Sequence, residues 1–222
     1  MINTECYMAQ LIESLSEQFK ARLLYVGLQG SYLRGEATNE SDIDIMVIID
    51  ELNVTDLECY RSIINALEYS EKSCGFICSK SDIANWNSLE ICHLLNTTKD
   101  YYGALRNFIP AYTKNDIQTF VKLSVNNLYH EICHRYIHAD YSKNVDSLPA
   151  SYKGVFFILQ NLYYLEHNQY ISTKAELLSL LSGKNHAVLE RAIGFSKNMS
   201  YHFPESFELL FTWCQEVLNT VS

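Results

Sequence analysis

The feature that most constrains this chain is a Gly-Ser pair that stands between two short apolar runs. The first run, Leu23–Leu28, is followed two residues later by Gly30 and Ser31. The second run, Ile43–Ile49, is rich in β-branched residues. Apolar runs of this length, bounded by turn residues, are typical of buried strands. We therefore expect a strand, a sharp turn at Gly30 and a second strand.

The Gly-Ser pair is suited to binding an anion, although it is not a P-loop. A Walker motif needs a Lys followed by Ser or Thr at the start of a helix, and no Lys follows Gly30 closely. Gly30 lets backbone N–H groups approach a phosphate, Ser31 supplies a hydroxyl, and the amino end of residues 32–35 would add donors. Arg34 is placed either to contact a phosphate or to remain a solvated surface residue.

Two aspartates at the start of the second run predict a metal site. Asp42 stands eleven residues after Ser31, and Asp44 follows one residue beyond it. Because successive side chains of a strand alternate, both carboxylates project from the same face. Mg²⁺ binds through one or two carboxylates and takes its other ligands from water and substrate phosphates. Mg²⁺ held there would orient a nucleotide for attack by a hydroxyl, which is nucleotidyl transfer.

The rest of the chain predicts an α/β half followed by a helical half. Apolar spacing predicts a helix that ends near Phe19, a capping box of Thr55 and Glu58 predicts another, and residues 76–78 form a third strand candidate. After about residue 85 the β signal fades. From Ile117 apolar residues recur every three or four positions, which predicts a long helix, and shorter helical patterns follow around residues 155–163, 177–181 and 207–218. The polar stretch 140–150, which contains Pro149, is interpreted as a connector.

Composition excludes several classes of function. The chain of 222 residues has 17 Lys and Arg against 26 Asp and Glu, a net charge of −9, so it offers no broad basic surface for nucleic acid. No stretch approaches the roughly 20 apolar residues that span a bilayer, and the first residues do not resemble a signal peptide. Seven cysteines without paired spacing are interpreted as reduced, buried thiols. We expect a cytoplasmic protein without a membrane partner.

The stretch YVGLQGSYLRGEATNESDIDIMVI, from Tyr25 to Ile48, resembles the signature of the polymerase-beta-type nucleotidyltransferase superfamily. The segments FICSKSDIANW, residues 76–86, and 155–171 are similar in order and spacing to the bacterial streptomycin and spectinomycin adenylyltransferases. In that group a nucleotidyltransferase domain precedes a helical domain, with ATP and the acceptor in the cleft between them. The resemblance thus implies an α/β (α+β) nucleotidyltransferase domain with a small mixed sheet over residues 1–110. An all-helical bundle follows over residues 111–222.

The resemblance also implies roles for individual residues. Gly30 and Ser31 would hold the triphosphate of ATP, Asp42 and Asp44 would hold Mg²⁺, and Ser41 precedes the acidic pair as it does in the antibiotic enzymes. The implied reaction transfers AMP from ATP to a hydroxyl of a small polar acceptor in the interdomain cleft. An aminoglycoside-like antibiotic is one such acceptor, and the activity would then be one of antibiotic resistance.

Two positions depart from the family pattern. Aligned without gaps from Asp82 and Trp86, the family's third carboxylate falls on Cys74, and a thiol does not replace a carboxylate as a Mg²⁺ ligand. Glu71, three residues earlier, would supply the missing catalytic carboxylate if the strand register slips. The acidic residue that contacts the drug in those enzymes falls near Ser151, which is neutral. These departures leave the acceptor and the strength of catalysis open.

Two alternative functions follow from the same residues. Minimal nucleotidyltransferases also act as antitoxins, so the chain could modify or bind a protein partner. The missing third carboxylate is also consistent with a nucleotide binder that has no catalytic activity. His130, His134 and His138 have the spacing of metal ligands on a helix, but without an HExxH motif they are interpreted as a polar helix face. Trp86 and Trp213 are interpreted as core residues.

Overall fold

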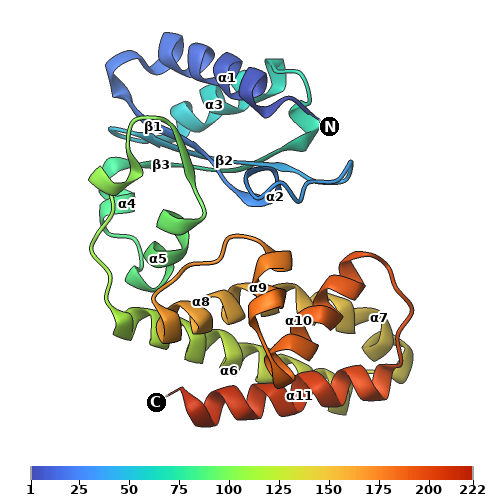
Figure 1. Ribbon diagram of the computed structural model, residues 1–222. Helices are drawn as coiled ribbons and strands as arrows, with labels where there is room; N and C mark the ends of the chain where they lie inside the picture. The colour runs from blue at the N-terminus through green and yellow to red at the C-terminus, as the bar shows by residue number, and fades with distance from the viewer. Residues whose placement is uncertain (1, 222) are drawn as a thin grey trace. The chain divides into compact units, whose positions relative to one another are not determined.

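The computed structural model describes residues 2–221, which divide into two compact units. One unit extends to Tyr112 and the other begins at Thr113. The first contains all the strands of the described chain, and the second is built from helices (Figure 1). This architecture confirms the predicted fold class, a small mixed sheet with helices followed by a helical bundle.

The sheet of the first unit has four strands in the order β3-β2-β1-β4. Their bounds are Leu23–Leu28 for β1, Ile43–Ile49 for β2, Ser73–Ser79 for β3 and Lys99–Tyr102 for β4. β1 pairs antiparallel with both β2 and β4, whereas β2 pairs parallel with β3. The predicted strands at 23–28 and 43–49 are confirmed. The sequence showed no β pattern after about residue 85, and the expectation that no strand follows was wrong. The polar segment Lys99–Tyr102 forms an edge strand.

Helices cover both faces of this sheet. α1 (Thr4–Phe19) and α3 (Val54–Ala66) pack on one face, and α4 (Lys80–Ala84) and α5 (Ser88–Asn96) pack on the other (Figure 1). A single turn, α2 (Gly30–Leu33), follows β1, and short 3-10 turns occupy Lys20–Arg22, Ser70–Lys72 and Leu105–Asn107. The helical turn after β1 therefore starts at Gly30, two residues earlier than predicted.

Side-chain alternation along β2 fixes which face carries the acidic pair. Ile43, Ile45 and Val47 belong to the core beneath α1 and α3, whereas Met46 and Ile48 belong to the core beneath α4 and α5. Since alternate residues of a strand share a face, Asp44 lies on the α4 and α5 side with Met46 and Ile48. The apolar residues on both sides of the sheet hold the strand in this register.

α3 begins differently from the prediction. Its N-cap is Asn53, whose side chain accepts a hydrogen bond of 3.1 Å from the backbone N–H of Asp56, while Asp56 Oδ2 accepts one of 3.0 Å from the Asn53 N–H. The predicted box of Thr55 and Glu58 is therefore wrong. Asn53 rather than Thr55 is the N-cap because its partner Asp56 is also held by Arg22. The Arg22 guanidinium donates to both carboxylate oxygens of Asp56, at 3.0 and 2.7 Å.

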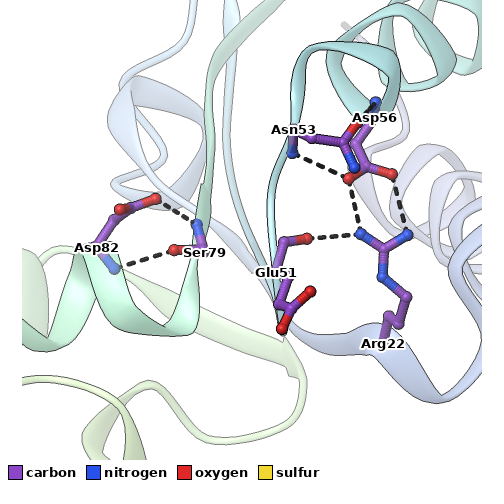
Figure 2. A network of polar contacts seen from close by, with 6 residues as sticks. All are labelled: Arg22, Glu51, Asn53, Asp56, Ser79 and Asp82. Atoms are coloured by element: carbon purple, nitrogen blue, oxygen red, sulfur yellow. Dashed lines mark hydrogen bonds and ion pairs between the residues drawn. The ribbon is translucent and has the colours of Figure 1, made fainter.

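Figure 2 shows this network together with a second capping box. The Arg22 guanidinium also donates to the Glu51 carbonyl at 2.6 Å, so it joins β1's start to the end of β2. Ser79 and Asp82 exchange reciprocal hydrogen bonds of 3.0 and 2.9 Å at the start of α4. Each box satisfies backbone donors that the first turn of a helix otherwise leaves free.

The second unit is a bundle of helices around one hydrophobic core (Figure 1). Its helices are α6 (Lys114–His138), α7 (Tyr141–Ser151), α8 (Val155–His167), α9 (Lys174–Leu180), α10 (Gly183–Ser196) and α11 (Phe203–Thr220), with a 3-10 turn at Tyr152–Gly154. The polar connector predicted over 140–150 is wrong: α7 occupies it, with Pro149 near its C-terminal end and Leu148 buried. α10 was not predicted. Across residues 2–221 no helix combines the length and apolar character that crossing a membrane requires.

Cysteines and tryptophans are distributed unevenly between core and surface. Cys78, Cys92 and Cys214 are buried, but Cys6 and Cys74 are exposed, so the prediction of buried thiols was wrong for these two. Trp213 is only 1% exposed in the core of the helical unit, where its indole N–H donates to Asn185 at 2.8 Å. Trp86, also predicted to be core, is only half-buried; its ring stacks on Phe76.

Candidate active site

The site forms where the end of β1 meets the start of β2. The backbone N–H of Gln29, which follows β1, donates a 2.8 Å hydrogen bond to the carbonyl of Asp44. The Gln29 side chain donates to Thr98 Oγ1 at 2.7 Å, and Thr98 in turn donates to the Leu94 carbonyl in α5 at 2.6 Å. These bonds connect the turn after β1 to β2 and to α5. They keep Gly30 next to Asp44.

Gly30 permits a contact that no other residue would. Its φ is +70°, a left-handed conformation that favours glycine. A Cβ atom placed on Gly30 would lie 1.8 Å from Asp44 Oδ2 and 2.7 Å from its Cγ. The Asp44 carboxylate therefore occupies the space that a side chain at position 30 would need. The predicted turn glycine and the predicted metal ligand form a single packed unit.

Asp42 and Asp44 lie on the same side of β2 but in different surroundings. Asp42 immediately precedes the strand and is exposed, whereas Asp44 is its second residue and is half-buried. Burial raises the pKa of the Asp44 carboxyl, and the neighbouring charge of Asp42 raises it further. A hydrogen bond from Cys74 and the positive charge of Arg34 lower it, with a smaller effect. In the folded protein the ionised form of Asp44 is therefore disfavoured, by burial and by the like charge of Asp42.

A divalent cation fits this arrangement. Within the described residues, no cluster of three or more His, Cys, Asp or Glu side chains is arranged to bind a metal ion. Two carboxylates are hard oxygen ligands that suit a cation such as Mg²⁺, which takes its other ligands from phosphates and water. Asp42 and Asp44 would hold such a cation, and its charge would relieve their mutual repulsion.

The predicted phosphate-binding residues are brought close to the acidic pair by a compact loop. Ser31 is half-buried in α2, and its carbonyl accepts a 2.9 Å hydrogen bond from the Glu36 N–H. Arg34 ends the same turn; its Nε lies 3.0 Å from Glu36 Oε2 and its side chain is only 13% exposed. Ser41 lies further along, where its hydroxyl accepts a 2.9 Å hydrogen bond from the Thr38 N–H. Ser41 thereby closes the loop that leads into Asp42.

The structure pairs Cys74, not Glu71, with Asp44. β3 runs parallel to β2 with Asp44 opposite Cys74, and the thiol donates a hydrogen bond to the carboxylate. Glu71 lies in the 3-10 turn Ser70–Lys72 before β3 and is exposed. The register slip that would bring Glu71 opposite Asp44 is absent from this pairing. The role of Glu71 as a base stays a prediction.

Sequence reasoning missed the contribution of α5. His93 on this helix lies near Arg34, and burial, reinforced by the Arg34 charge, lowers the pKa of His93 to about 4. Its imidazole is therefore neutral at ordinary pH. Thr98, just beyond the helix, anchors Gln29. No motif marks these residues, because they lie 49 or more residues after Asp44 in the chain and reach the site only through tertiary packing.

The first unit is similar in sequence to nucleotidyltransferase domains. A profile of the Nucleotidyltransferase domain matches residues 8–91. Two proteins of Methanocaldococcus jannaschii, both named "Putative protein adenylyltransferase", are similar: one is 46% identical over 61 residues and the other 35% identical over 79 residues. These stretches cover 28% and 32% of this chain and 56% and 78% of the relatives. The chain thus spans about half the length of the first relative.

A comparison of structures extends over both units. A spectinomycin adenyltransferase from Enterococcus faecialis, solved with ATP and spectinomycin, matches with a TM-score of 0.63 and 14% sequence identity. The match covers 98% of this chain and 100% of the other. At this identity the likeness shows a shared fold, including the helical part, and nothing about the ligands.

Proposed function

Because this chain belongs to the nucleotidyltransferase family, we propose that it transfers AMP from ATP to a hydroxyl group in a Mg²⁺-dependent reaction. The observation that carries this proposal is the contact of the Asp44 carboxylate with the Gly30 backbone, beside the like charge of Asp42. It joins the turn that we propose for phosphate binding to the acidic pair that we propose for cation binding. The unit up to Tyr112 would supply this chemistry, and the helical unit would supply specificity for the acceptor.

Different residues of the chain would take different roles in this reaction. Gly30 and Ser31 would donate to the phosphates of ATP, with Ser41 shaping the loop and Arg34 adding positive charge. Bound at Asp42 and Asp44, Mg²⁺ would supply charge neutralisation for the leaving pyrophosphate. The acceptor oxygen forms a bond to the α-phosphorus while the bond from that phosphorus to the bridging oxygen breaks. The hydroxyl proton passes to a base. Glu71 was predicted for this role only if the register of β3 slipped, and β3 pairs Cys74 with Asp44 instead, so the base is not assigned to a residue.

A small polar acceptor is the first candidate substrate. The likeness to the spectinomycin adenyltransferase extends over almost the whole chain, so the helical unit resembles one that accompanies antibiotic modification. An aminoglycoside-like or aminocyclitol compound with free hydroxyls is the class to test first. Resistance to such an antibiotic would be the corresponding cellular effect. The net charge of −9 favours a cationic acceptor.

A protein hydroxyl is the second candidate acceptor. The two relatives from Methanocaldococcus jannaschii carry names that assign them modification of proteins. A Tyr, Ser or Thr hydroxyl of a partner protein has the same nucleophilic group as a small alcohol. The chemistry at Asp42 and Asp44 would be identical, and only the acceptor would differ.

A pyrophosphate-release assay tests both candidates. Purified protein is incubated with ATP and Mg²⁺ and a panel of aminoglycosides, spectinomycin and other polyhydroxylated amines, and then with a cell lysate whose proteins are analysed by mass spectrometry for added AMP. Asp44→Asn serves as the blank, and Asp50→Asn, an exposed aspartate just after β2, as the matched control. We expect release that depends on one acceptor class, on Mg²⁺ and on Asp44.

The outcomes separate the alternatives. Release with one small compound identifies a small-molecule enzyme, and AMP on lysate proteins alone identifies a protein-modifying one. ATP binding by calorimetry without release under either condition would contradict catalysis and indicate a nucleotide-binding protein, as the thiol at position 74 allows. Full turnover by Asp44→Asn would show that the metal assignment is wrong.

A further inference from the structure

One hollow in the molecule is formed entirely by the helical unit. A cavity of about 610 Å³ lies among α9, α10, the start of α11 and the connection between the last two. Its walls include Arg191, Gly194, Phe195, Lys197, Tyr201 and Leu209. Cavities of roughly 300–1,000 Å³ are the size that holds a small organic ligand. None of the residues discussed for nucleotidyl transfer contributes to these walls.

Gly194 keeps this cavity open. It lies inside α10, where glycine is less favourable than alanine, and its φ is not in the left-handed region that would require glycine. A Cβ atom on Gly194 would meet only Met199 Sδ, at the ordinary contact distance of 3.7 Å. Neither backbone geometry nor packing therefore requires glycine here. The absence of a side chain leaves room within the cavity.

Arg191 gives the cavity a positive group without a negative partner. One guanidinium nitrogen, Nη1, lies 2.5 Å from the hydroxyl of Ser206, which is fully buried and donates to the His202 carbonyl at 2.8 Å. Among residues 2–221 Arg191 forms no ion pair with a carboxylate. The guanidinium carries five N–H donors in a planar fork, which matches a carboxylate or a phosphate. A half-buried cation of this kind is stabilised by an anion that enters the cavity.

The remaining charges and rings define the rest of the ligand. Of the two carboxylates in the walls, Glu205 lies 3.3 Å from His202 Nδ1, and Glu190 is exposed. Phe195 and Tyr201 pack edge to face with ring centroids 4.7 Å apart, and the Tyr201 hydroxyl donates to the Val145 carbonyl. The aromatic wall is thus fixed in place. It offers an apolar surface next to the guanidinium.

We propose that this cavity binds a small organic anion whose carboxylate or phosphate pairs with Arg191 and whose apolar body packs on Phe195 and Leu209. Lys197, which also forms no ion pair within the described residues, adds positive charge at the wall. The inference goes beyond nucleotidyl transfer, because it assigns the helical unit a ligand site of its own. It does not depend on the acidic pair.

Fragment binding to the full-length protein tests the site. The probes are phenyl phosphate and benzoate, with benzylamine and benzyl alcohol as cationic and neutral counterparts of the same ring. Binding is measured by isothermal titration calorimetry and by ligand-observed NMR, with ATP and Mg²⁺ present to occupy the nucleotide site. We expect both anions to bind at millimolar concentration and benzylamine not to bind.

Two variants with matched controls locate the binding. Arg191→Met, similar in length but uncharged, should weaken anion binding at least about tenfold, whereas Arg61→Met on an exposed face of α3 should not. Gly194→Leu should abolish binding by filling the cavity, whereas Gly154→Leu should not, since Gly154 also has open space around it but lies outside these walls. Circular dichroism checks that each variant is folded.

Three results would overturn the proposal: no binding of either anion, equal binding of benzylamine, or unchanged anion binding in Gly194→Leu. The Gly194 variant keeps Arg191 in place, so the test stands even if Arg191→Met fails to fold. Because pyrophosphate release is measured separately, failure of this site and failure of the proposed transferase activity give different results.

Discussion

Two carboxylates near opposite ends of β2, Asp44 within the strand and Asp56 in the first turn of α3, are in opposite electrostatic situations. At the far end, Asp56 receives two hydrogen bonds from Arg22 and one from the Asn53 backbone, and the Arg22 hydrogen bonds lower its pKa. At the near end, Asp44 is half-buried against Gly30, and burial together with Asp42 raises its pKa. One carboxylate is satisfied within the protein. The other is the carboxylate that we propose a cation neutralises.

This contrast separates structural charge from functional charge. A charge that the fold already neutralises contributes to stability, and its removal is felt mainly in unfolding. A charge that the fold leaves in repulsion lowers stability and marks a place where a ligand brings the missing counter-charge. The predictions below test whether the charge of Asp56 serves stability and the charge of Asp44 serves the reaction.

Gly30→Ala should have the largest combined effect. The new Cβ would displace the Asp44 carboxylate and would hold alanine at a positive φ. We expect activity to fall about 10³-fold or more and stability to fall by about 2 kcal/mol. Pyrophosphate release and urea denaturation measure the two effects. Near-normal turnover would show that the contact between Gly30 and Asp44 is not needed for the reaction.

Asp44→Asn should remove activity without harming the fold. Loss of a ligand that holds the cation predicts a decrease of about 10³-fold in pyrophosphate release. Because the ionised carboxylate is disfavoured by burial and by Asp42, the variant should unfold at the same or a higher temperature than the parent at neutral pH. Calorimetry of both proteins checks this. A clear decrease in the melting temperature of Asp44→Asn would show that the Asp44 charge stabilises the fold, as the Asp56 charge does, and would contradict the contrast between them.

Asp56→Ala should do the reverse. It removes the acceptor of the Arg22 hydrogen bonds and half of the Asn53 capping box, which predicts a loss of about 2 kcal/mol in the free energy of unfolding. Turnover of the folded variant at low temperature should stay within about twofold of the parent. A selective loss of turnover would give Asp56 a role in the reaction.

The pH dependence of stability should differ in sign and in range between the two aspartates. Asp56 has a folded pKa below its ordinary 3.8, so its contribution is present above that value and is lost as the pH falls through the folded pKa. Asp44 has a folded pKa above 3.8, so its ionised carboxylate lowers the free energy of unfolding at pH values above the folded pKa. This destabilisation disappears as the pH falls to 3.8. Unfolding of Asp44→Asn and Asp56→Asn from pH 7 to 3, each against the parent, measures both. Two differences of the same sign would contradict the contrast.

Cys74→Ala should have the smallest effect. It removes a hydrogen bond that lowers the pKa of Asp44, so that pKa should rise further and the acidic limb of the pH–activity profile should move to higher pH, with turnover on that limb about fivefold lower. Cys74→Ser keeps a donor at the same position and is the matched control. A pH profile of the activity separates a change in the Asp44 pKa from a general loss of structure.

Local patterns in the sequence predicted the centre of this site, and tertiary contacts account for what they missed. The apolar runs Leu23–Leu28 and Ile43–Ile49 are strands because their side chains are buried on both faces of the sheet. The turn glycine and the acidic pair were predicted from their spacing together with the resemblance to the nucleotidyltransferase signature. Spacing carries no information about how closely Gly30 and Asp44 pack, or about Cys74 as the partner of Asp44.

Two of the missed elements, β4 and α7, lack a regular pattern of apolar residues. β4 contains Lys99, Asp100 and two tyrosines at a sheet edge, where one side of the strand stays exposed. α7 contains Pro149, which usually indicates a loop; it is tolerated near the helix's C-terminal end, where Leu148 is buried in the core. Such segments become helix or strand through packing against neighbours, which a single sequence does not display.

The placement of the two tryptophans gives each unit its own optical reporter. Trp86 is half-exposed beside Phe76 in the unit that holds the acidic pair, and Trp213 is enclosed in the helical core. Fluorescence from an exposed indole is red-shifted relative to that from an enclosed one. Single-tryptophan variants would therefore show whether the two units melt together or one after the other, and which of them responds when a nucleotide or an organic anion is added.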